Sequence, residues 1–436
     1  MWTSRFASSV LIGAALLALA VTIYVAMGHE RFLTSPARGA LFLGLPLAGG
    51  AVFLGLLRLN AEIRLMAALV VLATGGALFG FELYLAGADR PTASDAPTKY
   101  QIALELRGQG KDAYPAAFPA YLLATRLDGS LASPLALDGA EMLPLGGIAR
   151  ATTVLCAEGA APVVYDSDDM GFNNPADLWR RIEPMEIAVI GDSFVHGYCV
   201  APPKSLVALV RARHPLTLNL GMSGNGPLIE LALLREFAPL LRPRHVVWVF
   251  YEGNDIENLA VERRSPLLMR YLDSDFRQGL AEKAARLDPI YRRHLDSLFA
   301  AAPDLRETDA GPLQRILSFV GLARTRARLG GGAHAVLDEA FLDRILARAH
   351  ETTGGRMVVA YLPDRRRYEP GGPGVAGLES IRAAVKRIAE RRGLRVLDLV
   401  DVFAREPDPR GLYDGHLSER GQRIVAEAVL AAIGEK

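Results

Sequence analysis

The sequence predicts an α/β protein in which a doubly wound parallel sheet lies between two layers of helices, an αβα arrangement. From residue 186 onward, short apolar segments alternate with amphipathic helical segments, which is typical of parallel strands joined by crossover helices. A strongly apolar N-terminal part and a short β-rich stretch precede this region. We therefore expect the 436 residues to form a membrane region, a small unit and a larger α/β domain.

The composition excludes several classes of protein. Apolar residues make up 50% of the chain and charged residues 22%, which is unusually apolar for a soluble enzyme and argues against disorder. Lys and Arg number 49 against 48 Asp and Glu, so no excess of positive charge favours nucleic-acid binding. Two cysteines are too few for a disulfide-rich scaffold or a four-cysteine zinc site. We expect no nucleic-acid partner, no cofactor and no metal.

Residues 1–86 are predicted to be a membrane region with three transmembrane helices. The runs 6–27, 39–57 and 65–86 each hold about 20 mainly apolar residues, near the length that crosses a ~30 Å hydrocarbon core. Glu82, near the end of the third run, is expected to reach the interface. The first run also fits a cleaved signal peptide, and both interpretations export the rest of the chain. We expect a multi-pass protein of the inner (cytoplasmic) membrane whose larger part is extracytoplasmic or periplasmic.

Residues 87–99 and 100–184 connect this region to the larger domain. The first segment is polar with two prolines and is predicted to be a linker. In the second, a helical segment at 100–109 is followed by short apolar segments at 121–124, 151–156 and 162–165, which predict a small extracytoplasmic β-rich unit. We find no chemical motif in this unit and expect it to space or cap the larger domain, with glycan binding as the alternative.

Residues 185–436 are predicted to form the doubly wound domain. Its elements are expected as five strands at 187–190, 216–220, 245–251, 356–362 and 394–399, and as helices at 204–213, 227–241, 376–392 and 418–433. Residues 256–354 interrupt this alternation and are expected to be a helical insertion that caps the domain.

Polar and glycine-rich segments follow the predicted strands, at the sheet edge where sites form in open α/β folds. Gly-Asp-Ser at 191–193 follows the first strand, Ser-Gly at 223–224 the second, and Gly-Asn-Asp at 253–255 the third. Asp-Gly-His at 414–416 follows the last strand after a loop. A serine needs a base within hydrogen-bond reach to act as a nucleophile, so Ser193 and His416 are the expected pair.

In these four blocks the sequence resembles the SGNH (GDSL) hydrolases, and residues 167–175 are similar to the membrane-anchored bacterial members of that family. The resemblance implies the SGNH hydrolase fold, a flavodoxin-like three-layer sheet. It also implies that Ser193 is the nucleophile and His416 the base. The oxyanion hole is then formed by the N–H groups of Ser193 and Gly224 and by the side chain of Asn254.

Asp414 is implied as the group that orients His416. The commonest family pattern has two residues between this aspartate and the histidine, whereas here only Gly415 separates them. Asp408 or a backbone carbonyl is therefore kept as an alternative. His196 lies three residues after Ser193, and we expect it to pack or line the rim rather than act as the base.

The resemblance implies a serine esterase, a carboxylic ester hydrolase or O-acyltransferase that forms an acyl-serine intermediate. An exported position favours O-acetyl groups of envelope or exopolysaccharide glycans as substrate, with lipid esters next. The partners expected are this ester or acylated glycan, the lipid bilayer, and a membrane partner in polysaccharide synthesis or export. The alternative is a non-catalytic scaffold on the same fold that binds a glycan or a membrane complex.

Cys156 and Cys199 are a candidate disulfide. Cys156 ends a predicted strand of the small unit, Cys199 follows the serine turn, and an exported domain meets an oxidising compartment. Two buried free thiols are the alternative, since cysteine is often a small apolar core residue.

Overall fold

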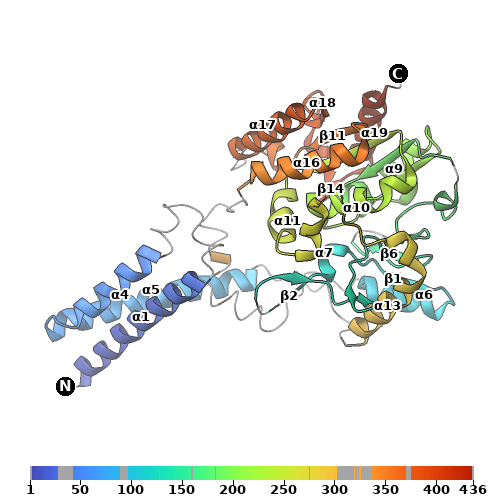
Figure 1. Cartoon of the computed structure of the whole chain (residues 1–436). Coiled ribbons are helices and arrows are strands. Elements are labelled where there is room, and N and C mark those ends of the chain that lie inside the picture. Colours follow the sequence, from blue (N-terminus) through green and yellow to red (C-terminus); the bar gives the residue numbers. More distant parts are fainter. Residues whose placement is uncertain are drawn as a thin grey trace. The chain divides into compact units, whose positions relative to one another are not determined.

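The computed structural model describes residues 2–27, 43–88, 97–126, 128–158, 161–181, 183–273, 275–301, 319, 322, 324–325, 336–369 and 375–434. The chain divides into two compact units (Figure 1). The first consists of residues 1–93 and 310–332, and the second of residues 94–309 and 333–436. Most of the predicted linker lies outside the described residues.

The first unit contains three apolar helices, α1 (Trp2–Met27), α4 (Leu45–Leu56) and α5 (Ala61–Ala88). Helices α1 and α5 are long and apolar enough to cross a membrane, and only 17% and 6% of their most apolar windows are buried within the structure. A core helix of a soluble protein buries most of its apolar surface, so the exposed side chains of α1 and α5 are suited to lipid.

Helix α4 differs from the predicted full span. It has 12 residues and a proline in its first turn, and it is shorter than the ~30 Å membrane core because a helix rises only about 1.5 Å per residue. Proline lacks an N–H and is tolerated in the first turn of a helix. Residues 39–42 of the predicted run lie outside the described residues.

Glu82 on α5 is fully buried among protein groups. Its carboxylate accepts hydrogen bonds from the backbone N–H groups of Arg324 and Thr325, at 3.1 and 2.8 Å, and from the Thr325 hydroxyl at 2.8 Å. Arg324 and Thr325 belong to the long insertion, so part of the insertion packs within the first unit.

The second unit is built on a five-stranded sheet with the order β12-β11-β10-β8-β9, in which every neighbouring pair is parallel. Its strands are β8 (Ile187–Ile190), β9 (Thr217–Asn219), β10 (His245–Tyr251), β11 (Met357–Leu362) and β12 (Arg395–Asp398). The chain moves outward from β8 to β9 and then returns to the other side of β8, so β8 and β10 flank the switch point of the sheet. This confirms the predicted flavodoxin-like αβα fold.

Helices cover both faces of this sheet. Successive residues of a strand point to opposite faces, so each strand contributes side chains to both helix layers. Ile187 and Val189 pack on one face with α9 (Leu206–Arg211), α18 (Leu399–Phe403) and α19 (Glu419–Ile433). Ala188 and Ile190 pack on the other face with α10 (Pro227–Leu241), α16 (Glu339–Thr353) and α17 (Val375–Arg391). The helix predicted at 204–213 is shorter than expected, because α9 covers only residues 206–211 and residues 202–204 form a separate 3-10 turn.

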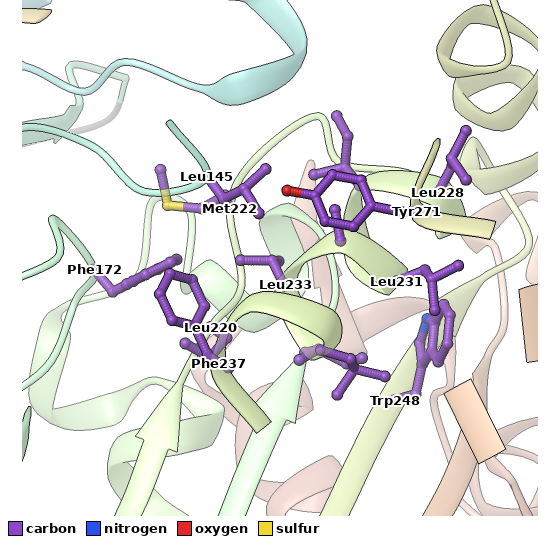
Figure 2. Close-up of a cluster of buried hydrophobic side chains, with 14 of the residues drawn as sticks. Leu145, Phe172, Leu220, Met222, Leu228, Leu231, Leu233, Phe237, Trp248 and Tyr271 are labelled. Atoms are coloured by element: carbon purple, nitrogen blue, oxygen red, sulfur yellow. The ribbon is translucent and has the colours of Figure 1, made fainter. Parts of the chain in front are cut away.

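The small unit at 100–184 shares its core with the larger domain. It contains α6 (Lys99–Gly108) and a three-stranded sheet of β1 (Ala113–Pro115), β6 (Thr152–Cys156) and β7 (Val163–Asp166). Its Leu145 and Phe172 lie in one cluster with Phe237 of α10 (Figure 2). Two short hairpins complete it, β2 (Ala124–Thr125) with β3 (Leu131–Ala132) and β4 (Ala136–Leu137) with β5 (Ala140–Glu141).

One segment of the small unit differs from its prediction. Residues 121–124 were expected to form a strand. Instead, residues 121–122 belong to the short helix α7 (Pro119–Leu122), and β2 begins only at residue 124. Pro119 occupies the first turn of α7, where its fixed φ favours the helix.

The insertion is also shorter than predicted. Helices α11 (Asp255–Glu262), α12 (Pro266–Met269) and α13 (Leu280–Ala301) belong to it, but α16 is the regular crossover helix that leads into β11. The remaining short elements are α8 (Ser193–His196), β13 (Tyr413–Asp414), β14 (His416–Leu417), and the 3-10 turns at 178–180, 202–204, 270–272, 365–368 and 410–412.

Candidate active site

Ser193 lies at the sharp turn from β8 into α8, beside the switch point of the sheet. A Cβ at Gly191 would come within 2.6 Å of the Val195 side chain, so this turn requires glycine. Asp192 caps α8 by accepting a hydrogen bond from the Phe194 N–H at 3.0 Å. The Ser193 side chain is thereby held in the wall of a cavity of about 440 Å³.

His416 lies in the C-terminal part of the chain, in β14, and contacts Ser193 across a sequence separation of 223 residues. The distance from its Nε2 to the Ser193 Oγ is 2.9 Å, whereas the Asp192 carboxylate is 3.5 Å from the same Oγ. The rings of Phe194 and Tyr198 lie 5.1 and 4.8 Å from the imidazole. Burial lowers the pKa of His416, so the ring is neutral at pH 7 and can accept the serine proton.

The predicted oxyanion residues line the same cavity as Ser193 and His416. Gly224 lies in the loop after β9, and its φ of +80° is a conformation that favours glycine. Asn254 ends the turn after β10, and its side chain forms a hydrogen bond with the Asp192 carboxylate. The four sequence blocks therefore meet around one cavity.

Asp414, which was predicted to orient His416, lies opposite it in a hairpin but does not bond to its ring in the described structure. The two residues face each other in the small hairpin of β13 and β14, with Gly415 at φ +69° between them. Directly opposed residues of antiparallel strands project from the same face. The Asp414 side chain is nevertheless exposed, and among the described residues no hydrogen bond joins it to the His416 ring. Asp408 accepts the Gly411 N–H at 3.1 Å instead of contacting His416. The orienting group stays a prediction.

His196 is completely buried, and its ring nitrogens contact Tyr165 and Ser223. Its Nδ1 lies 3.3 Å from the Ser223 N–H, a contact in which the ring accepts, and its Nε2 lies 3.0 Å from the Tyr165 hydroxyl. The Nδ1 is also 3.2 Å from the Ser223 hydroxyl. Burial lowers the pKa of His196 to about 3, so it stays neutral. Its role is to connect β7 to the loop that carries Gly224, which the sequence did not reveal.

Buried carboxyl groups lie behind this loop. Glu262 accepts the backbone N–H groups of Gly226 and Leu228, at 2.6 and 2.9 Å, and burial raises its pKa to about 8. Burial also raises the pKa of Asp192 to about 6. The pKa values of Glu230 and Asp255 are raised well above normal by burial and by the neighbouring carboxylates. The Glu262 carboxyl is therefore mainly neutral at pH 7.

The other wall of the cavity consists of residues that the sequence analysis did not select. They come from the α7 segment of the small unit, from the loop after β6, from the turn after α8 and from α11: Phe118, Ala120, Tyr121, Leu123, Glu158, Tyr198, Asn258 and Val261. The available signal was the pair of aromatic residues on either side of Pro119. The small unit thus forms part of the site rather than only spacing or capping the domain.

The structure joins Cys156 and Cys199 by a disulfide, with a Cα–Cα distance of 5.2 Å. The bond links the end of β6 to the turn after α8. The side chain of Glu158 lies within 4.8 Å of both sulfur atoms, so the three could form a metal site only in the reduced state. In the described structure the bond instead fixes the small unit beside the serine turn.

We next compared the chain with known protein families and solved structures. The model of the GDSL-like Lipase/Acylhydrolase family matches residues 189–424, more than half of the chain, from β8 through His416. A lipase/acylhydrolase from Enterococcus faecalis is similar in structure at 15% identity, covering 57% of this chain and 95% of that one, with a TM-score of 0.33.

An acetylxylan esterase from Geobacillus stearothermophilus is similar at 18% identity, covering 58% of this chain and 95% of that one, with a TM-score of 0.33. A search of curated proteins finds no match. The blocks around Ser193, Gly224, Asn254 and His416 all lie within the matched region. The chain belongs to the GDSL-like lipase/acylhydrolase family and is an ester hydrolase of the SGNH type.

Proposed function

We propose that the chain is a membrane-anchored, extracytoplasmic serine esterase or acyltransferase that acts on O-acetyl groups of envelope or exopolysaccharide glycans. The observation that carries this proposal is the 2.9 Å contact between Ser193 Oγ and the neutral His416 Nε2, in a cavity that Gly224 and Asn254 also line. Such a pair is the minimum needed for attack by serine on an ester carbonyl.

In the first half of the reaction, Ser193 Oγ attacks the carbonyl carbon while its proton passes to His416 Nε2. The negative charge that develops on the carbonyl oxygen is stabilised by the N–H groups of Ser193 and Gly224 and by the Asn254 amide. The bond to the sugar oxygen then breaks, and His416 gives its proton to that oxygen. The products are the free sugar hydroxyl and an acyl-Ser193 ester.

In the second half, His416 takes a proton from water, and the resulting nucleophile attacks the acyl-Ser193 carbonyl. Collapse of this second intermediate returns the proton to Ser193 Oγ and releases the carboxylic acid. If a sugar hydroxyl replaces the water, the same steps transfer the acyl group. Hydrolysis and transfer therefore share the whole first half, and we assign Asp414 to holding the imidazole in both.

Two features support a position outside the cytoplasm. A disulfide such as Cys156–Cys199 persists in oxidising compartments and is rare in the cytosol. The exposed apolar surfaces of α1 and α5 favour a multi-pass anchor in the inner membrane. A glycan substrate and a membrane partner in polysaccharide synthesis or export are consistent with this position.

The test uses the full-length protein in detergent with a small activated acetate ester. We expect turnover and covalent labelling by a serine-directed phosphonate, and Ser193→Ala should abolish the labelling and lower the rate by several orders of magnitude. Asn254→Ala should lower the rate by about 10²–10³-fold, as expected for loss of one oxyanion donor. A wild-type protein that shows neither turnover nor labelling would instead favour the non-catalytic scaffold.

A further inference from the structure

Side chains of the small unit form much of one wall of the catalytic cavity, and Tyr198 and residues of α11 complete that wall. We propose that this wall is a carbohydrate subsite in which Tyr121 stacks on the ring of a neutral O-acylated sugar and so brings its ester to Ser193. This inference rests on the proposed esterase function and specifies how the substrate is recognised.

Tyr121 is held in an unusual position for a large aromatic side chain. The neighbouring Pro119 and Leu122 of α7 are buried, whereas Tyr121 is 66% exposed. A Cβ placed on Gly224 would lie 3.4 to 3.5 Å from the Tyr121 ring and hydroxyl. The ring therefore lies in near contact with the loop of an oxyanion donor, and a ligand stacked on it lies beside the reacting carbonyl.

The other two aromatic rings that line the cavity, Phe118 and Tyr198, each lie close to a cation. The Lys99 ammonium lies 5.1 Å from the Phe118 ring centre and 5.6 Å from that of Tyr198. Tyr198 also packs against His416. Tyr121 meets Phe118 edge-on at 5.6 Å, an arrangement that supports its ring and leaves most of its surface exposed.

Two residues that can accept hydrogen bonds line the same cavity as Tyr121. Asn258 lines the cavity, and its Nδ2 donates to the Asn225 carbonyl at 3.0 Å, so its Oδ1 is fixed as an acceptor. Glu158 also lines the cavity, and its carboxylate lies within 4.8 Å of both disulfide sulfur atoms. Acceptors of this kind suit the hydroxyl groups of a sugar and offer nothing to an alkyl chain.

The wall thus offers a sugar both an aromatic face and hydrogen-bond acceptors. A pyranose has a face of C–H groups that can cover an aromatic ring and an edge of hydroxyl groups that seek acceptors. A cavity of about 440 Å³ is within the ordinary range for a small-molecule site. A carboxylate in the wall disfavours an acidic sugar, which is why we specify a neutral one.

The test compares two acetate esters in full-length protein: an acetylated xylo-oligosaccharide and vinyl acetate, which has no ring. The measured quantity is the ratio of their kcat/KM values. Tyr121→Ala should lower this ratio by about tenfold, mainly through KM for the sugar ester, because a stacking surface is lost. Tyr121→Phe retains the ring and should keep the ratio within about twofold.

Leu240→Ala is the matched control, because Leu240 is a large exposed side chain on α10, 55% exposed, that does not line the cavity. It should leave both rates unchanged. A ratio that is unaffected by Tyr121→Ala, or that falls equally in Tyr121→Phe, overturns the subsite. Wild-type protein that cleaves vinyl acetate but not the sugar ester also overturns it.

A binding measurement separates this proposal from the proposed function. In the Ser193→Ala protein, saturation-transfer NMR with the acetylated xylo-oligosaccharide should detect binding that Tyr121→Ala removes and Tyr121→Phe retains. If this pattern appears while the wild type has no esterase activity, the subsite holds and the esterase proposal fails. If the wild type is an active esterase and no binding is seen, the subsite alone fails.

Discussion

At the scale of single residues, the protonation state of His416 decides whether Ser193 can be activated. Burial between Phe194 and Tyr198 disfavours the imidazolium ion, and no compensating carboxylate contacts the ring among the described residues. The neutral base is therefore available at a lower pH than for an ordinary histidine. The raised pKa of Asp192, about 6, adds a second group that titrates in the acid range.

This arrangement predicts the pH dependence of the reaction. His416 must be neutral to accept a proton, so kcat/KM should rise with increasing pH, with a midpoint below the ordinary histidine value of 6.5. The measurement is a profile of kcat/KM for an activated acetate ester, repeated with Asp192→Asn to remove the second titrating group. A midpoint above 6.5 in both proteins would contradict the neutral buried base.

A second prediction concerns the group that orients His416. If Asp414 closes onto the imidazole when substrate is bound, Asp414→Asn should lower kcat strongly, because the carboxylate no longer fixes the tautomer. Asp408→Asn is the control, since Asp408 accepts a hydrogen bond from Gly411 in its own loop. A strong loss in Asp408→Asn with a mild one in Asp414→Asn would reverse the assignment.

At the scale of elements, two contacts connect the small unit to the catalytic loops. The His196 ring joins Tyr165 of β7 to Ser223, next to Gly224. The disulfide joins β6 to the turn after α8. Both contacts are buried or partly buried, and together they hold the unit that carries Tyr121 against the serine turn. The small unit therefore helps to set the geometry of the site.

The disulfide gives a prediction at this scale. It closes a loop with a sequence separation of 43, for which chain-entropy estimates give about 4 kcal/mol of stability. The Cys156→Ser/Cys199→Ser double variant should therefore melt at a temperature lower by about 5 °C, judged from the entropy of unfolding of a domain this size. Differential scanning calorimetry of the detergent-solubilised protein measures this.

The control is a reducing agent, which should lower the melting temperature of the wild type but not that of the double variant. Mass mapping without reductant supplies an independent check on protein purified from membranes. If both cysteines are alkylated under those conditions, the bond is not formed in the native protein, and the argument for export weakens with it.

At the scale of the whole molecule, the chain combines an apolar unit with an ester hydrolase domain. In α1 and α5, large side chains such as Leu16, Leu17 and Leu83 are 60%, 66% and 65% exposed, a surface that water would penalise. Burial in lipid removes this penalty. The buried Glu82 carboxylate on α5 is compatible with such a setting because residues 324–325 satisfy it with hydrogen bonds.

This predicts that the full-length protein fractionates with membranes and is released by detergent but not by high salt. Protease added to the outer side of sealed cells or spheroplasts should digest the hydrolase domain, whereas protease confined to the cytoplasmic side should not. Digestion only from the cytoplasmic side would reverse the orientation. The mass of the purified chain shows whether the first apolar run has been removed.

The sequence by itself determined the architecture of the hydrolase domain and the sheet edge at which its candidate catalytic residues meet. Strands β10 and β11 are continuous apolar runs, because a parallel strand covered on both faces must be apolar throughout, and their bounds agree with the predictions to within a residue. Ser193 and His416 were identifiable because chemistry in such folds concentrates just beyond strand ends. These signals involve residues that are close together in the chain, so they can be recognised from the sequence.

Only the tertiary structure decided what surrounds that centre. The position of Tyr121 beside Gly224 and the contacts of His196 depend on packing between segments far apart in the chain. The separation of α16 from the insertion likewise depends on its packing against α10 and β11. Local propensity describes how each segment folds, but a cavity wall exists only where several segments meet. For this reason the contribution of the small unit to the site could not be recognised from a sequence motif, although in the folded chain this unit completes the cavity wall.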